Sequence, residues 1–322
     1  IESCFNPLTN IPKNLDDELH LYLIWIMSKP EYFAMMTKYI FNLDLTPMQF
    51  CILRTFWYKK FPMLIGSRGL SKTYLLAVYC LLRLLLLPKR KIVVAGAAFR
   101  QSKFVFEYME TIWNNAPVLR DLVGGHGGPS KDVDMWRFRI FDSVASFIPI
   151  GPGGDKIRGL RANDVFADEF SSLQREVFET VIVGFGAVSS SPIENMKQKA
   201  AEKQARKLEI WVDDAEDSVF SNIPNQLLLS GTAYYAFNHF AHYWKIWHKI
   251  IESEGDRSKI ALAFGGEDKC DPSISHKDFA VIRIPYDLIP EGFMDAAQVA
   301  RSRATFDTGT FEMEYLAIFS KD

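Results

Sequence analysis

Short apolar runs of strand length alternate along this chain with longer segments of helical periodicity. The strand-like runs are rich in Val, Ile, Leu and Phe and stand at residues 63–65, 91–95, 165–167, 226–229 and 280–285. Two more runs, at residues 135–141 and 146–150, have the spacing of a hairpin or of paired strands. Strands that alternate with helices are typical of a mostly parallel sheet flanked by helices. The pattern therefore predicts an α/β fold.

The helical segments lie mainly between these runs. Helices are expected at residues 15–41, from Pro47 onward with Thr46 as N-cap, at about 104–113, and at 195–210, 236–251 and 295–304. The segment at 195–210 is rich in lysine and precedes an acidic run, and we interpret both as solvated surface. The most apolar segment is residues 74–87, which is interrupted by Arg83 and followed by Pro88. It is too short to span a membrane, so we expect a helix packed against the sheet.

The composition excludes some classes of protein but does not indicate a function. The chain has 322 residues, of which 48% are hydrophobic and 24% charged, as in an ordinary globular protein with a substantial core. The net charge of −2 provides no overall basic field, so contacts with nucleic acid would have to come from local patches. The 4 cysteines form no C-x-x-C pair, which argues against a zinc site or a disulfide framework and suits a reducing cytoplasm.

A phosphate-binding loop follows the first buried strand. Its residues are Gly66, Ser67, Arg68, Gly69, Leu70, Ser71, Lys72 and Thr73. Backbone N–H groups of such a loop converge on phosphate oxygens, Lys72 adds a positive charge near the β- and γ-phosphates, and the Thr73 hydroxyl can bind Mg²⁺. The match to G-x-x-x-x-G-K-[ST] is incomplete, because Ser71 stands where the second glycine is usual. A strand–helix turn that binds nothing is the alternative for this segment alone.

Two adjacent carboxylates follow the strand at residues 165–167. At the carboxyl end of a parallel strand, Asp168 can hold Mg²⁺ and Glu169 can act as the general base that orients the attacking water. Two exposed acids at the start of a loop are the alternative, which the phosphate loop upstream makes less favourable. The glutamate favours an ATPase of the helicase and motor type over a GTPase, and no Asn-Lys-x-Asp guanine signature is present.

In their order and spacing, these segments resemble the ATPase domain of the large terminases of tailed bacteriophages, over about residues 45–319. The resemblance also rests on short motifs elsewhere: Arg68 in the loop, residues 45–49 as an adenine-recognition segment containing Gln49, Arg100–Gln101, Arg158 to Arg161, Ser230–Gly231–Thr232 and residues 311–316. Two features depart from the family. One is Ser71, and the other is the long interval between Asp168 and Ser230.

The resemblance implies a RecA-like P-loop NTPase fold of the additional-strand, catalytic-glutamate type with a small lid subdomain. The expected division is an N-terminal helical segment (1–44), an ATPase core (45–265) and a lid or linker subdomain (266–322). Large terminases usually also have a nuclease domain. No late cluster of spaced acidic residues is left to build one, so we expect the ATPase portion alone.

The resemblance further implies ATP hydrolysis that drives double-stranded viral DNA into a procapsid, with Mg²⁺ as cofactor. Thr73 and Asp168 would hold the metal, Glu169 would be the base, and Gln49 would contact the adenine. Ser230, Gly231 and Thr232 would couple the γ-phosphate state to later helices. For the arginine finger, Arg68 would act within its own subunit and Arg158 would reach a neighbour's site, with Arg161 as the alternative; structural ion pairs are the other interpretation.

The implied partners are double-stranded DNA, gripped through its phosphates, the portal of the procapsid and the small terminase subunit. We expect a homo-oligomeric ring when assembled, a monomer in isolation, no membrane association, and a place in the host cytoplasm rather than in the virion. Two other functions stay open. A helicase-type DNA translocase would need a second motor core in the chain, and a nucleotide-gated assembly protein would hydrolyse ATP negligibly.

Overall fold

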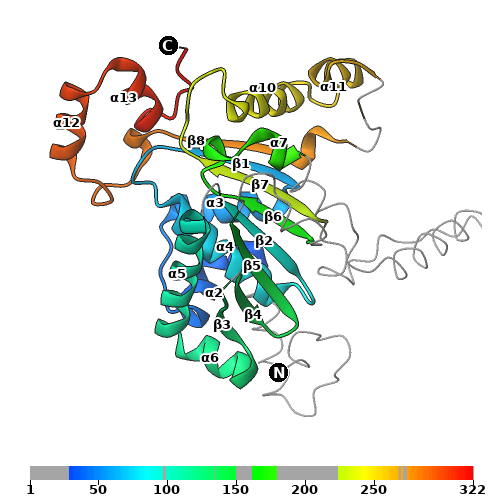
Figure 1. Ribbon diagram of the computed structural model, residues 1–322, viewed down its shortest axis with the longest axis vertical. Coiled ribbons are helices and arrows are strands. Elements are labelled where there is room, and N and C mark those ends of the chain that lie inside the picture. The colour runs from blue at the N-terminus through cyan, green and yellow to red at the C-terminus, as the bar shows by residue number, and fades with distance from the viewer. Residues whose placement is uncertain are drawn as a thin grey trace, which may run out of the picture.

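The computed structural model describes residues 29–96, 99–133, 135–149, 162–179, 224–267, 270 and 274–321, with the backbone alone at residues 99–101, 126 and 149. Within them lies one eight-stranded sheet (Figure 1). Its strands are β1 (Phe61–Gly66), β2 (Lys91–Gly96), β3 (Gly128–Lys131), β4 (Trp136–Ile140), β5 (Ser143–Pro149), β6 (Asp164–Ala167), β7 (Gln226–Gly231) and β8 (Phe279–Ile284).

The strand order is β3-β4-β5-β2-β6-β7-β1-β8. All neighbouring pairs are parallel except those of β4, which runs antiparallel to β3 and β5. β7 is inserted between β6 and β1, the strands that precede the two predicted nucleotide motifs. The protein therefore has the predicted α/β P-loop NTPase fold with an additional central strand, and all five predicted parallel-strand runs are strands of this sheet.

Helices cover both faces of the sheet. One face is packed by α2 (Phe33–Ile40), α3 (Pro47–Tyr58), α4 (Lys72–Leu86), α5 (Phe99–Asn115) and α6 (Pro117–Val123). The other face is packed by η5 (Phe170–Ser172), α7 (Arg175–Val177), α10 (His239–Glu252) and α11 (Arg257–Phe264). Successive residues of β1 and β2 alternate between these two cores, which explains why their sequences read as continuous apolar runs.

Smaller elements complete the fold. They are the 3₁₀ turns η2 (Pro30–Tyr32), η3 (Gly124–His126), η9 (His276–Asp278) and η10 (Tyr286–Leu288), and the late helices α12 (Ala296–Thr305) and α13 (Thr308–Glu314). α12 and α13 lie to the side of the sheet, after β8 (Figure 1). β8 itself pairs with β1, so it belongs to the sheet although it follows residue 265. The division at residues 44/45 and 265/266 stays a prediction.

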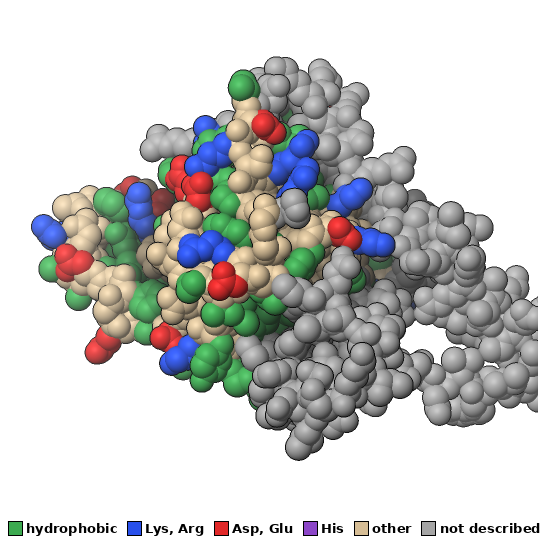
Figure 2. Space-filling model, turned by 90° about the horizontal axis from the view of Figure 1, so that it is seen from below, with side chains coloured by type: hydrophobic (Ala, Val, Ile, Leu, Met, Phe, Trp, Pro, Cys, Tyr) green, Lys and Arg blue, Asp and Glu red, His purple; other side chains and the backbone are tan. Residues whose placement is uncertain are grey.

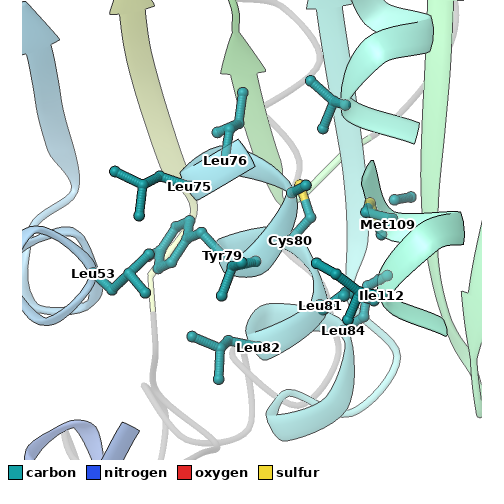
Figure 3. Packing of buried hydrophobic residues seen from close by; sticks show 14 of the residues in the cluster. Leu53, Leu75, Leu76, Tyr79, Cys80, Leu81, Leu82, Leu84, Met109 and Ile112 are labelled. Carbon is teal, nitrogen blue, oxygen red and sulfur yellow. The ribbon is translucent and has the colours of Figure 1, made fainter. Parts of the chain in front are cut away.

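α4 is the central helix of the larger core. Almost every residue from Lys72 to Leu86 is buried, and Figure 3 shows its leucines between Leu53 of α3 and Met109 and Ile112 of α5. The predicted cap of α3 is confirmed, because Thr46 and Gln49 form a capping box. α5 begins at Phe99, earlier than the expected residue 104. The predicted helix at 195–210 and residues 15–28 of the N-terminal one lie outside the described residues.

Arg83, which interrupts the apolar run of α4, is paired inside the core. Its guanidinium and that of Arg90 both donate to Asp164, the first residue of β6, with N–O distances as short as 2.7 Å. All three side chains are buried. Burial by itself raises the pKa of Asp164, but the two arginines outweigh it and hold that pKa below its ordinary value. This cluster joins the phosphate-loop helix to the strand that leads to Asp168, and the sequence did not reveal it.

No helix among the described residues is long and apolar enough to cross a membrane. Figure 2 views the molecule from the end that carries α6 and β3. On the described part of that face, basic and acidic side chains are interspersed. This agrees with the small net charge of the chain.

Candidate functional site

The predicted motifs meet at the carboxyl ends of three neighbouring strands. β1 ends at Gly66, β6 leads to Asp168, and β7 leads to Thr232. Because β7 lies between the other two strands, the residues that follow them form one edge of the sheet. Ligands of open α/β sheets bind at this edge.

Lys72 is held in the middle of this edge. Its side chain is 7% exposed, and Nζ donates to the backbone oxygens of Gly66 (3.1 Å) and Ser67 (3.3 Å) and to Thr232 Oγ1 (3.0 Å). Burial lowers the pKa of Lys72, while the nearby carboxylates of Glu169 and Asp168 oppose that shift. An ammonium group in this position satisfies all three donors and is ready to exchange them for phosphate oxygens.

The phosphate loop is anchored by the end of β8 and by α13. The N–H of Ser67 donates to the carbonyl of Ile284 at the end of β8 (2.9 Å), and the N–H of Arg68 donates to the carbonyl of Glu314 in α13 (2.7 Å). Gly69 has φ +87°, and a Cβ there would lie 2.9 Å from Met294 Cγ. The loop is thus fixed to β8 and to the late helices, and Gly69 is required both by its conformation and by the close packing.

Ser71 occupies the position where a glycine is usual. Its backbone is left-handed, with φ 61° and ψ 38°, and its side chain does not cap α4. The first backbone N–H groups of α4 therefore have neither an intrahelical acceptor nor a side-chain cap. They are free to donate to a phosphate. Ser71 preserves the loop conformation at the cost of an unfavourable φ for a residue with a Cβ.

Asp168 is almost completely buried, with 1% exposure, beside the phosphate loop. Its Oδ2 accepts a hydrogen bond from Thr73 Oγ1 at 2.9 Å, and its backbone N–H donates to Ala95 of β2. Its Oδ1 is buried and has no hydrogen-bond partner within the described structure. Burial raises the pKa of Asp168 to about 7, and the neighbouring Glu169 carboxylate adds to the shift. A buried, unsatisfied carboxylate oxygen requires a cation or a proton.

These residues fit a Mg²⁺ ion. The hydroxyl of Thr73 and the free oxygen of Asp168 are hard oxygen ligands, and a divalent charge would counteract the rise in the pKa of Asp168. No group of three or more His, Cys, Asp or Glu side chains in the described parts of the chain could hold a metal by itself. Mg²⁺ does not need one, because it commonly keeps waters and binds substrate phosphates.

Glu169 is oriented by β7. Its Oε2 accepts a hydrogen bond from the backbone N–H of Thr232 at 3.4 Å. Its own backbone is left-handed, with φ 47° and ψ 53°, which is uncommon for a residue with a side chain. The hydroxyl of Thr232 contacts Lys72 at the same time. Thr232 therefore joins the lysine of the phosphate loop to the candidate base, and the three predicted motifs form one hydrogen-bonded group.

The other two residues of the predicted coupling motif, Ser230 and Gly231, are buried at the end of β7. Ser230 Oγ has no hydrogen-bond partner within the described structure. A Cβ on Gly231 would lie 3.2 Å from the backbone nitrogen of Phe170 and 3.5 Å from Cα of Glu169. The absence of a side chain at Gly231 lets β7 approach the backbone that carries Glu169.

In the described structure, Arg68 and Gln49 take no part in the hydrogen bonds between Lys72, Thr232 and Glu169. Arg68 is 68% exposed and lies 3.8 Å from the carboxylate of Glu314. Arg158 and Arg161 lie outside the described residues, and at Arg100 and Gln101 only the backbone of α5 is described. Gln49 is 5% exposed, and its side-chain oxygen accepts from the N–H of Thr46.

The adenine contact of Gln49 and the finger roles of the arginines stay predictions. The capping bond already uses the acceptor of the Gln49 side chain, which leaves its amide N–H groups to recognise a base. The N-cap at Thr46 is predicted from a threonine followed by Pro47 at the first helical position, and the structure adds the reciprocal bond of a capping box from Gln49.

Sequence reasoning missed several residues around the site. Glu314 contacts the phosphate loop from a helix that we had matched only as a motif, and Met294 packs on Gly69. Asn238 and His239, at the start of α10, hold the segment that follows Glu169. The one available signal was the position of Asn238 as a helix N-cap before an apolar periodic segment.

Comparisons with known proteins give the same fold. No family model matches the chain, and no curated protein matches it. The structure is similar to the large terminase ATPase domain of Thermus phage P74-26, with a TM-score of 0.51, 13% identity, and coverage of 91% of this chain and 98% of that one.

Two longer terminases show the same likeness. The large terminase of a thermophilic bacteriophage matches with a TM-score of 0.55 and 11% identity, and that of bacteriophage HK97 with 0.50 and 13%. Each match covers 86% of this chain but only 54% and 51% of the respective terminase. At these identities the likeness establishes the fold, which is the one that large terminase ATPase domains share. The chain spans about half the length of these two terminases.

Proposed function

We propose that this chain is the ATPase part of a terminase-type DNA-packaging motor, and that it hydrolyses ATP to move double-stranded viral DNA into a procapsid. One observation carries the enzymatic half of the proposal. At the carboxyl ends of adjacent parallel strands, hydrogen bonds join Lys72 and Glu169 through Thr232, and the next residue of the loop, Thr73, bonds to Asp168. This is the arrangement that phosphoryl transfer to water requires.

The roles of the side chains follow from their surroundings. Lys72 moves its hydrogen bonds from the loop carbonyls to the β- and γ-phosphates, where its charge offsets the charge of the transition state. The first N–H groups of α4 donate to the same phosphates. Glu169 takes a proton from the attacking water, whose oxygen bonds to the γ-phosphorus as the bond to the ADP oxygen breaks.

Thr73 and Asp168 would hold the Mg²⁺ ion of the substrate complex, and the ion would supply charge neutralisation at the phosphate oxygens. The hydroxyl of Thr73 already contacts Asp168 Oδ2, so the two ligands are close enough to share one ion. Asp168 Oδ1, which has no hydrogen-bond partner in the described structure, is the oxygen best placed to become its ligand.

The coupling role is proposed for Ser230, Gly231 and Thr232. Thr232 touches both Lys72 and Glu169, so loss of the γ-phosphate changes its contacts on two sides. The change reaches α10 directly, because only a short loop separates Thr232 from this helix.

Arg68 is proposed as the candidate finger within the same subunit. Its contact with Glu314 is long and exposed, so breaking it costs little free energy. Arg158, and Arg161 as the alternative, are proposed to serve a neighbouring subunit in a ring.

The motor half of the proposal is supported by the fold and by the order of the sequence motifs. The structural relatives are named as large terminases or their ATPase domains, and the sequence motifs occur in the order of that family. From this we infer the partners: double-stranded DNA, the portal of the procapsid and the small terminase subunit.

The test is release of inorganic phosphate from ATP and Mg²⁺, with and without double-stranded DNA. We expect slow hydrolysis by the parent chain and a loss of roughly 10²–10⁴-fold in Glu169→Gln, because the amide cannot accept the proton. Lys38→Ala, on the exposed surface of α2, is the matched control and should hydrolyse at the parent rate. Hydrolysis that is unchanged in Glu169→Gln would refute the assignment, and a parent chain that binds ATP without any turnover would favour a nucleotide-gated assembly protein.

A further inference from the structure

The start of α10 closes on the backbone next to Glu169. Asn238 is the N-cap of this helix, and its Oδ1 accepts from the N–H of Phe240 at 2.9 Å. Its Nδ2 donates to the carbonyl of Ser171 at 3.1 Å. The adjacent His239 donates from Nε2 to the carbonyl of Phe170 at 2.9 Å. Two neighbouring side chains thus hold two successive carbonyls of η5, immediately after the candidate base.

The hydrogen bond of His239 also defines its protonation. A carbonyl oxygen only accepts, so Nε2 must carry the hydrogen. Burial lowers the pKa of His239, and the neutral ring then has its single N–H on the nitrogen that faces Phe170. The imidazole is therefore a fixed donor rather than a mobile charge.

The segment that these residues hold is one that needs support. Glu169 has a left-handed backbone, which side-chain-bearing residues adopt only where the surroundings impose it. The Phe170 ring is fully buried and makes edge-on contacts with His239 (4.7 Å between centroids) and Phe240 (5.4 Å). From the other side, Gly231 approaches the backbone of Phe170 without a side chain.

The segment from Thr232 to His239 therefore contacts Glu169 at its beginning and the two residues after Glu169 at its end. At the beginning, the N–H of Thr232 donates to the Glu169 carboxylate. At the end, Asn238 and His239 hold the carbonyls of the two residues that follow Glu169. The first contact orients the side chain and the second sets the backbone from which it projects.

We propose that Asn238 and His239 are positioning residues for the catalytic base, acting through the backbone of Phe170 and Ser171 to keep Glu169 directed at the attacking water. The inference rests on the proposed ATPase function. Neither residue contacts the phosphate loop in the described structure, so both should influence the chemical step and leave nucleotide binding unaffected.

A purely structural role makes a different prediction, and two variants separate the possibilities. Asn238→Asp keeps the oxygen that caps α10 but replaces the donor to Ser171 with a carboxylate oxygen. His239→Phe keeps an aromatic ring against Phe170 but removes the N–H. If the two residues served only to cap the helix and fill the core, both variants would be nearly silent.

The experiment measures single-turnover ATP hydrolysis, ATP affinity and thermal unfolding of the full chain. We expect His239→Phe and Asn238→Asp each to slow hydrolysis by roughly 10-fold to 10²-fold, as for a misplaced catalytic group, with ATP affinity within about twofold of the parent. His248→Phe, at an exposed position of the same helix, is the matched control and should hydrolyse at the parent rate.

A double variant tests whether the effect passes through Glu169. If it does, His239→Phe should cause no further loss in a Glu169→Gln background, because the base has already been removed. Additive losses, parent-rate hydrolysis in both single variants, or a parallel fall in ATP affinity and unfolding temperature would overturn the proposal. A parent chain whose hydrolysis does not depend on Glu169 would instead refute the proposed function, so the two failures are distinguishable.

Discussion

Replacing Asp168 with asparagine should remove a pH-dependent loss of stability from the nucleotide-free protein. Asp168 is 1% exposed, and its pKa is raised from 3.8 to about 7, first by burial and then by the adjacent Glu169 carboxylate. The folded state therefore holds this proton more tightly than the unfolded chain. Stability from this group is highest at low pH and declines as pH rises from about 4 to about 7.

The size of the effect follows from the two pKa values. The difference between a pKa of 3.8 and one of about 7 corresponds to about 4 kcal/mol, of which about 2–3 kcal/mol falls between about pH 5 and pH 8. The asparagine side chain of the variant would not titrate. It would be a buried amide without a full set of partners, which costs roughly 1–3 kcal/mol, but that cost does not depend on pH.

The measurement is urea unfolding of the parent and of Asp168→Asn at several pH values from about 5 to about 8, without nucleotide or Mg²⁺. The difference in free energy of unfolding should change by about 2–3 kcal/mol in favour of the variant as pH rises. Asp142→Asn, at an exposed position next to β5, is the control and should show no such trend. A difference that stays flat across this range would refute the strongly raised pKa, and with it the argument that the free oxygen of Asp168 requires a cation.

Three further predictions concern the phosphate loop and the carboxylates. Lys72→Ala should abolish turnover and weaken ATP binding by at least about tenfold, because it removes charge-assisted hydrogen bonds of roughly 1.5–3 kcal/mol. Unchanged affinity in a fluorescent-nucleotide titration would contradict the loop assignment. In a Mg²⁺ titration of single-turnover hydrolysis, Asp168→Asn should require more Mg²⁺, whereas Glu169→Gln should stay slow at every concentration; the reverse outcome would exchange their roles. Ser71→Gly should stabilise the protein by roughly 0.5–1 kcal/mol. A left-handed serine costs about 1–2 kcal/mol, and the greater chain entropy of an unfolded glycine offsets about 0.5–1 kcal/mol of the gain. A lower urea midpoint in the variant would count against strain at φ 61°.

The sequence was sufficient for the parallel strands and for the local chemistry, but not for β3, α6 or α11. The phosphate loop and the Asp168–Glu169 pair are contiguous motifs, and their residue types carry the chemistry in any fold that places them at strand ends. The strands that precede them are buried on both faces, so their apolar runs are continuous and easily recognised. The cap at Thr46 was also predictable, because a capping box is made by residues three positions apart.

Tertiary structure decided which of these residues touch. Thr232 meets Lys72 across 160 residues of sequence, because β7 lies beside β1 in the sheet. Thr73 meets Asp168 across 95 residues, because α4 begins at the same edge of the sheet at which β6 ends. The hydrogen bonds from Asn238 and His239 to the segment after Glu169 form because β7 also lies beside β6. The buried pairing of Arg83 with Asp164 likewise depends on how α4 packs on the sheet.

The sequence also did not predict the buried oxygen of Asp168 that has no hydrogen-bond partner in the described structure, or the left-handed backbones of Ser71 and Glu169. A sequence pattern shows the periodicity and the residue types within one short segment of the chain. Contacts between distant residues, and the desolvation that shifts their pKa values, depend on the order in which the strands assemble, and that order is set by the packing of the whole domain.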